Sequence, residues 1–135
     1  MKIVLDTNVL VSGLLTPYGP AAQIIRMVAA GTVQLIYDVR IITEYRSVLG
    51  RPRFGFDRGK VDILLNQIEL LGHPVASLPL NGTLPDEGDR PFLEAAVTAQ
   101  VNYLVIGNVR HFPRDLRSGV GVVSPAEFVM RFIET

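Results

Sequence analysis

Short apolar runs alternate along the chain with longer segments whose apolar residues recur every three or four positions. The short runs predict strands at residues 3–5, 33–36, 103–106 and 120–123, and residues 75–78 as either a strand or an extended connection. The longer segments predict helices at residues 20–30, 39–49, 58–71 and 90–100, and after residue 124. This alternation is typical of an α/β fold with a mostly parallel sheet.

Capping residues mark several of these helices. Asp38 and Asp57 are placed to cap the helices that follow them, and Gly72 is placed to end the second one. The sequence SPAE at residues 124–127 has the form of a capping box.

The first strand ends at a carboxylate. Asp6 follows residues 3–5, and Thr7 and Asn8 come next. A charge at the rim of a core costs free energy unless a metal ion or a hydrogen-bond network compensates it. The strand pattern by itself does not show whether a metal ion or a hydrogen-bond network compensates the charge of Asp6.

Other polar residues fall where an α/β sheet gathers its site, beyond the carboxyl ends of the strands. Asn108 follows the strand that ends at residue 106, and Asp89 precedes a helix. Asp86 lies in the loop before Asp89. Glu44 lies at the edge of the apolar stripe of its helix and can lean toward a cleft.

Converging carboxylates repel one another, and a hard divalent cation removes that repulsion. Mg²⁺ or Mn²⁺ prefers oxygen ligands, keeps bound water and can promote phosphodiester hydrolysis.

Each of these candidate site residues also has a structural alternative. These alternatives are a backbone hydrogen bond for Asp6, a helix cap for Asp89, a solvated helix charge for Glu44, a turn for Asn108 and a solvated loop charge for Asp86.

Composition narrows the function classes. A length of 135 residues favours a single domain that spans residues 1–135. The formal net charge of the sequence is zero. There is no cysteine, which excludes disulfides and thiolate catalysis. Neither a signal peptide nor an apolar run of about 20 residues is apparent, so we expect a soluble cytoplasmic protein without membrane contact.

Eleven of the 13 basic residues are arginine, and they cluster twice. Candidate RNA contacts are Arg46, Arg51 and Arg53 in one cluster and Arg110, His111 and Arg114 in the other. Phe54 and Phe56 interleave the first cluster, and guanidinium groups with aromatic rings suit single-stranded RNA. The first cluster can equally be interpreted as a solvated loop whose two phenylalanines pack on the core and which does not bind RNA.

Four segments together resemble the motifs of the PIN-domain family, in order along the chain. They are LDTNVL at residues 5–10, RIITEY with VL and RPRF at residues 40–54, PDEGDRPFLEAA at residues 85–96, and YLVIGN with RHF at residues 103–112. The resemblance is greatest to PIN proteins described as toxins of toxin–antitoxin systems, related to the VapC type.

The resemblance implies a three-layer α/β/α sandwich around a mostly parallel sheet and an acidic pocket that binds Mg²⁺ or Mn²⁺. It also implies endoribonuclease activity that leaves a 3′-hydroxyl and a 5′-phosphate. Asp6, Glu44 and Asp89 match the acidic metal-binding residues of the motifs, Asn108 stands where many relatives carry a fourth catalytic Asp, and Thr7, Asn8 and Asp86 match supporting positions. Such proteins often form homodimers, and an antitoxin protein silences them.

Two residues depart from the family pattern. Ile106 stands where relatives often carry Thr or Ser, and Asn108 removes one negative charge. They motivate an alternative function, a PIN-fold module that binds RNA or protein with weak or no catalysis. A phospho-acceptor Asp, as in receiver domains, needs a Lys after a later strand, and the chain has only Lys2 and Lys60.

Overall fold

The structure, a computed structural model, describes residues 1–109 and 112–134. Within them, five strands form one sheet in the order β3-β2-β1-β4-β5, and every pairing is parallel. The strands are β1 (Lys2–Leu5), β2 (Gln34–Tyr37), β3 (His73–Pro74), β4 (Tyr103–Val105) and β5 (Gly121–Val123). The predicted α/β fold is confirmed, and these strands are wholly rather than mostly parallel.

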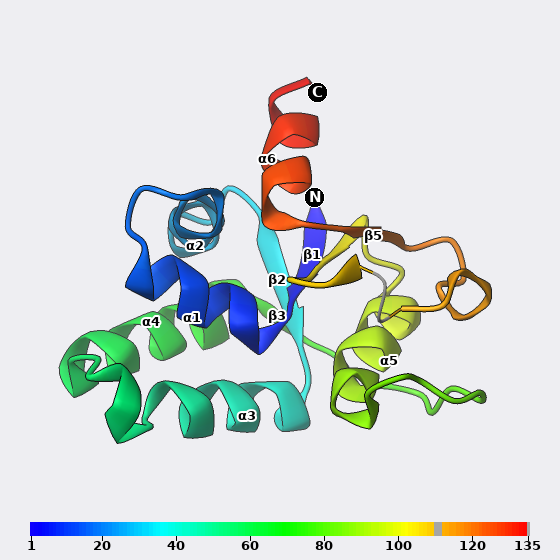
Figure 1. The fold of residues 1–135 in the computed structure, drawn as a ribbon, viewed down its shortest axis with the longest axis horizontal. Coiled ribbons are helices and arrows are strands. Elements are labelled where there is room, and N and C mark those ends of the chain that lie inside the picture. Colours follow the sequence, from blue (N-terminus) through cyan, green and yellow to red (C-terminus); the bar gives the residue numbers. More distant parts are fainter. Residues whose placement is uncertain (110–111, 135) are drawn as a thin grey trace.

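Helices cover both faces of this sheet. In the described residues the α-helices are α1 (Thr7–Leu15), α2 (Pro20–Ala29), α3 (Val39–Leu49), α4 (Arg58–Leu71), α5 (Arg90–Ala99) and α6 (Pro125–Glu134). Figure 1 shows α1, α2 and α4 on one side of the sheet and α5 on the other. Helix, sheet and helix therefore form the three layers that the resemblance to PIN domains implies. No helix in this described part is long and apolar enough to span a membrane.

The predicted helix starts are confirmed by their capping bonds. The Asp38 carboxylate accepts a hydrogen bond from the Ile41 N–H at 3.0 Å, at the start of α3. The Asp57 carboxylate accepts one from the Lys60 N–H at 3.0 Å, at the start of α4. The Ser124 hydroxyl oxygen accepts one from the Glu127 N–H at 3.2 Å in α6. These local signals work because each satisfies an N–H group that the helix itself leaves unbonded.

Helix α1 was not expected from the apolar pattern. Its sequence, TNVLVSGLL, is apolar on most sides because the helix is buried on most sides, so no amphipathic stripe marks it. A Cβ on Gly13 would lie 2.4 Å from Ile25 Cδ1 and 3.0 Å from the Ala21 carbonyl. Glycine at this position therefore permits the close approach of α1 to α2.

The segment at residues 75–78 is an extended connection rather than a strand. Pairing with β2 occurs earlier, at β3, and the Val75 N–H still donates to the Tyr37 carbonyl at 2.8 Å. The chain then leaves the edge of the sheet. This connection leads to the turn that carries Asp86 and Asp89.

Strand β1 lies at the centre of the sheet, between β2 and β4. Its residues Ile3, Val4 and Leu5 are completely buried. From β1 the chain moves outward through β2 and β3, and then returns to the opposite side of β1 to form β4 and β5. Open parallel sheets bind their ligands beyond the carboxyl ends of the strands at such a reversal, which here lies between β1 and β4.

Gly72 joins α4 to β3 in a space that admits no side chain. A Cβ there would stand 2.5 Å from the Ile68 carbonyl oxygen and 2.6 Å from the Leu35 carbonyl oxygen. Because both neighbours are backbone atoms, we expect Gly72→Ala to lower the free energy of unfolding by about 2 kcal/mol or more in urea denaturation. The control is Gly107→Ala, whose Cβ would meet nothing within 4 Å. Equal stabilities of the two variants would contradict this packing.

Candidate active site

A pocket of about 220 Å³ opens beside the carboxyl end of β1. Side chains from four separate parts of the sequence meet there. Its lining residues are Asp6, Thr7, Asn8, Glu44, Val48, Arg51, Arg53, Phe54, Asp86, Gly88, Asp89 and Phe92. We call it the acid pocket, because Asp6, Glu44, Asp86 and Asp89 all line it.

Asp6 enters the acid pocket directly from the central strand. Its backbone N–H donates to the Val105 carbonyl at 3.0 Å, so the pairing of β1 with β4 extends up to this residue. Burial of the carboxyl raises the pKa of Asp6 from 3.8 to about 6, and repulsion from the Asp89 carboxylate contributes to the rise. The N–H groups of Asn8 and Thr7 oppose it, and Glu44 adds further repulsion.

The side chain of Asp6 makes no capping hydrogen bond to α1. Its carboxylate nevertheless accepts hydrogen bonds from the Asn8 and Thr7 N–H groups, which lower its pKa, so the structural alternative for Asp6, a bond to the next turn, applies in part. The nearby N–H groups stabilise the carboxylate only in part, because the net shift of its pKa is still upward.

Asp89 reaches the acid pocket on a short 3-10 turn, η2 (Glu87–Asp89), that leads into α5. The Asp86 side chain accepts from the Gly88 N–H at 2.9 Å, and the Asp86 carbonyl accepts from the Asp89 N–H at 3.1 Å. Asp89 occupies the N-cap position of α5, as the cap alternative expects, but its side chain makes no capping hydrogen bond there. One of its carboxylate oxygens is buried.

Glu44 is partly buried in the middle of α3 and is held from two sides. The buried Thr7 hydroxyl donates a hydrogen bond to Glu44 Oε2. The next residue, Tyr45, is fully buried and donates its hydroxyl to the Leu5 carbonyl, directly before Asp6. These two bonds fix α3 against the end of β1, so Glu44 is not a freely solvated helix charge.

Arg51 and Arg53 supply the basic side of the acid pocket. Both are exposed, and Arg53 lies over the Phe54 ring with its guanidinium carbon 4.8 Å from the ring centroid. Phe54 and Phe56 stack on each other with centroids 5.5 Å apart, and both pack against the core. The phenylalanines therefore fit the core-packing alternative, which leaves the two guanidinium groups as the candidates for phosphate contact.

Arg46 and Arg114, two other predicted RNA contacts, do not line the acid pocket. Arg46 forms an ion pair with Glu69 at 2.8 Å, and Arg114 is exposed in the short turn η4 (Arg114–Leu116). Arg110 and His111 lie outside the described residues.

Ile106 and Asn108 follow β4. The Ile106 side chain is buried in the core, which explains why an apolar residue is tolerated there. Asn108 is exposed and is not among the residues that line the acid pocket. Its catalytic role remains a prediction.

A family model described as a PIN domain matches residues 2–110, which include all the predicted acidic residues. The chain belongs to the PIN-domain family. Comparisons with curated proteins and with solved structures find no match. PIN domains are generally nucleases that use divalent metal ions, so membership indicates a nuclease-type function and a nucleic-acid substrate.

The donor set of this PIN domain fits such an ion. Asp6, Glu44 and Asp89 offer hard oxygen atoms to one pocket, where burial, and after it repulsion from Asp89 and Glu44, raises the pKa of Asp6. Among residues 1–109 and 112–134, no three acidic or histidine side chains are already grouped closely enough to coordinate a metal. Mg²⁺ does not need such a group, since it usually takes one or two carboxylates and retains several waters.

Several residues that shape the acid pocket were not predicted from the sequence. Gly88 lines it within η2, and Val48 and Phe92 form its apolar wall. The bond from Tyr45 to Leu5 depends on a contact across 40 positions. Local patterns do not carry that information.

The raised pKa of Asp6 makes a prediction about stability. The folded state binds this proton more tightly than the unfolded chain, so the charge lowers stability increasingly as the pH rises from 3.8 to about 6. In metal-free protein, we expect Asp6→Asn to raise the free energy of unfolding by about 1–3 kcal/mol near pH 7.5 and by much less near pH 4.

Thermal unfolding in EDTA at the two pH values measures the effect. Asp62→Asn, at an exposed position on α4, is the control and should change stability little at either pH. A lower melting temperature for Asp6→Asn near neutral pH would show that the Asp6 charge stabilises the fold.

Proposed function

We propose that this PIN domain is a metal-dependent endoribonuclease and the toxin of a toxin–antitoxin pair. The observation that carries the proposal is the acid pocket, in which Asp6, Glu44 and Asp89 meet at the reversal point of a parallel sheet. Arg51 and Arg53 line the same pocket, so carboxylates and guanidinium groups face one space. We take residues 1–135 as one catalytic domain that acts in the cytoplasm.

In this proposal, Asp6, Glu44 and Asp89 hold Mg²⁺ or Mn²⁺, directly or through water. The bound ion would activate a water molecule and neutralise charge on the scissile phosphodiester. Thr7 keeps the Glu44 carboxylate turned toward the pocket through its hydrogen bond. Asp86 shapes the turn that presents Asp89.

Arg51 and Arg53 would bind the phosphates of the RNA strand on either side of the scissile bond. Guanidinium groups suit this task because they remain charged and can donate two hydrogen bonds to one phosphate. The choice of RNA as substrate, and the antitoxin and homodimer partners, depend on the resemblance to PIN toxins. A neighbouring gene for a small DNA-binding protein would support the toxin role.

Ribonuclease assays test the proposed reaction. We expect cleavage of single-stranded RNA with Mn²⁺ or Mg²⁺, no cleavage in EDTA, and a rate about 100-fold or more lower for Asp6→Asn. Asp62→Asn, purified in the same way, should match the wild type. Equal cleavage by Asp6→Asn and wild type would indicate a contaminating nuclease and remove the assignment.

The guanidinium groups should affect binding of RNA more than its cleavage. We expect Arg53→Gln to raise KM about 5-fold or more with little change in kcat, because one phosphate contact is lost. The slope of log KM against log salt should fall by about 0.7. Arg131→Gln, which removes an exposed arginine on α6, is the matched control. An unchanged KM for Arg53→Gln would exclude this contact.

A second candidate function is a PIN-fold module that binds RNA or protein with little catalysis. It is favoured by the lack of a preformed group of three metal-binding side chains in the described residues, and by Ile106 and Asn108 in the fourth motif. Calorimetric titration separates the two functions. No heat of binding at millimolar Mn²⁺ or Mg²⁺ would favour the module.

A further inference from the structure

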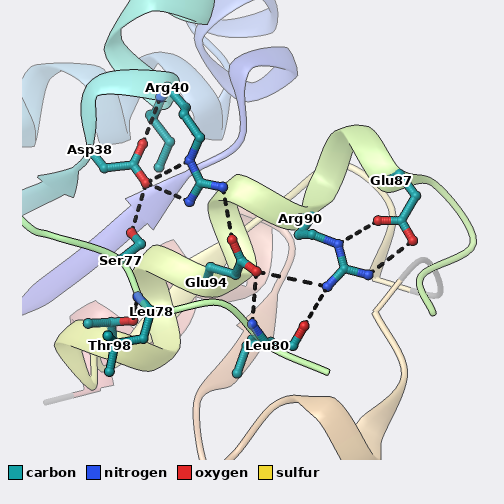
Figure 2. Close-up of polar contacts among 10 residues, drawn as sticks. Asp38, Arg40, Ser77, Leu78, Leu80, Glu87, Arg90, Glu94 and Thr98 are labelled. Carbon is teal, nitrogen blue, oxygen red and sulfur yellow. Dashed lines mark hydrogen bonds and ion pairs between the residues drawn. The ribbon is translucent and has the colours of Figure 1, made fainter. Parts of the chain in front are cut away.

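Two buried carboxylates outside the acid pocket share one arginine. Asp38 is 7% exposed and Glu94 is 4% exposed. Arg40 lies between them, with Nη2 2.8 Å from Asp38 Oδ2 and Nη1 2.8 Å from Glu94 Oε1 (Figure 2). Arg40 belongs to α3 and Glu94 to α5, so this pair joins two helices. Buried charges remain stable only when they are paired and hydrogen-bonded in this way.

Glu94 also holds the segment before η2, residues 77–84, which we call the strap. The Leu80 N–H donates to Glu94 Oε2 at 2.9 Å, and Arg90 donates to the carbonyls of Leu80 at 2.9 Å and Gly82 at 2.7 Å. Figure 2 shows Glu94 between Arg40 on one side and Arg90 and Leu80 on the other. The strap is therefore tied to α5 by side chains of α5 itself.

The two ends of the strap have further bonds. The Ser77 hydroxyl donates to Asp38 Oδ2 at 2.8 Å, and the Leu78 N–H donates to Thr98 Oγ1 at 2.9 Å. At the other end, the Leu84 N–H donates to Glu87 Oε1 at 3.4 Å, and Glu87, in η2, forms an ion pair with Arg90 at the start of α5. The chain then passes directly into the turn that presents Asp86 and Asp89 to the acid pocket.

The residues bound by Glu94 flank both acidic positions. Arg40 precedes Glu44 by one helical turn on α3, and Asp89 immediately precedes Arg90 at the start of α5. We infer that Glu94 is a positioning residue, which sets the placement of Asp89 relative to Glu44 in the acid pocket through Arg40 and the strap. The catalytic consequence rests on the proposed function, but the positioning itself does not.

Glu94→Gln is the informative variant, because it keeps the size of the side chain and an oxygen that can accept from Leu80. It removes the charge that pairs with Arg40 and Arg90. Glu127→Gln is the matched control, since Glu127 forms an exposed ion pair with Arg131 on α6 at 2.7 Å. Thr98→Val is a second control that releases the strap only at Leu78.

Amide hydrogen exchange in metal-free protein tests the positioning without any activity. In Glu94→Gln we expect hydrogen exchange of the Leu80 and Asp89 amides to accelerate about 10-fold or more, while the exchange rates of the β1 amides stay unchanged. Neither control should alter the Asp89 amide. Unchanged Leu80 and Asp89 amides, or uniform acceleration that includes β1, would overturn the inference.

RNA cleavage tests the consequence for the site. We expect Glu94→Gln to lower kcat about 10-fold or more with KM within about 2-fold, because the carboxylates are displaced while the phosphate contacts remain. A normal kcat in Glu94→Gln would overturn the inference. If the wild type cleaves no RNA, the proposed function fails, and hydrogen exchange alone decides the positioning.

A variant that retains charge covers the case in which Glu94→Gln does not fold. Arg40→Lys keeps the positive charge, but a single ammonium group does not reproduce the planar fork that contacts both carboxylates. We expect Arg40→Lys to accelerate hydrogen exchange of the Asp89 amide relative to the amides of β1. Exchange at wild-type rates in Arg40→Lys would overturn the inference.

Discussion

Burial of a charge at the end of the central strand is the constraint on which the site depends. Leu5 is completely buried, and Asp6 follows it at once. The carboxyl group loses hydration there, and Asp89 and Glu44 add repulsion instead of neutralisation, so the pKa of Asp6 rises to about 6. A fold gains nothing in stability from such an arrangement. Its persistence is explained if a cation supplies the missing charge, which is what a PIN nuclease requires.

Helix α3 fixes the geometry around that charge. The hydroxyl of Tyr45 bonds to the end of β1, the hydroxyl of Thr7 bonds to Glu44, and Arg40 reaches Glu94 on α5. Helix α3 therefore contacts the end of β1, which directly precedes Asp6, and α5, which directly follows Asp89. Repelling carboxylates stay near one another because these contacts hold in place the backbone segments that carry them.

The sequence was sufficient for features that have local signals. Alternating patterns predicted the α/β order, and Asp38 and Asp57 marked their helices, because a cap acts within one turn. Helix α1 was missed because burial on most sides removes its periodicity. The contact between Arg40 and Glu94 spans 54 positions, and only the folded chain brings the two together. The candidate acids were named from their places at the ends of elements and from motifs, whereas the roles of Arg40, Tyr45 and Glu94 in holding them were not foreseen.

The central claim, that the acid pocket binds a divalent metal, is tested most directly by crystals grown with Mn²⁺ and measured for anomalous scattering. The account predicts a strong anomalous peak in contact with Asp6, with Glu44 and Asp89 bound directly or through water. The peak should vanish in crystals of Asp6→Asn. A map with no peak in the acid pocket at saturating Mn²⁺ would contradict the account and leave the carboxylates without the ion that explains their placement.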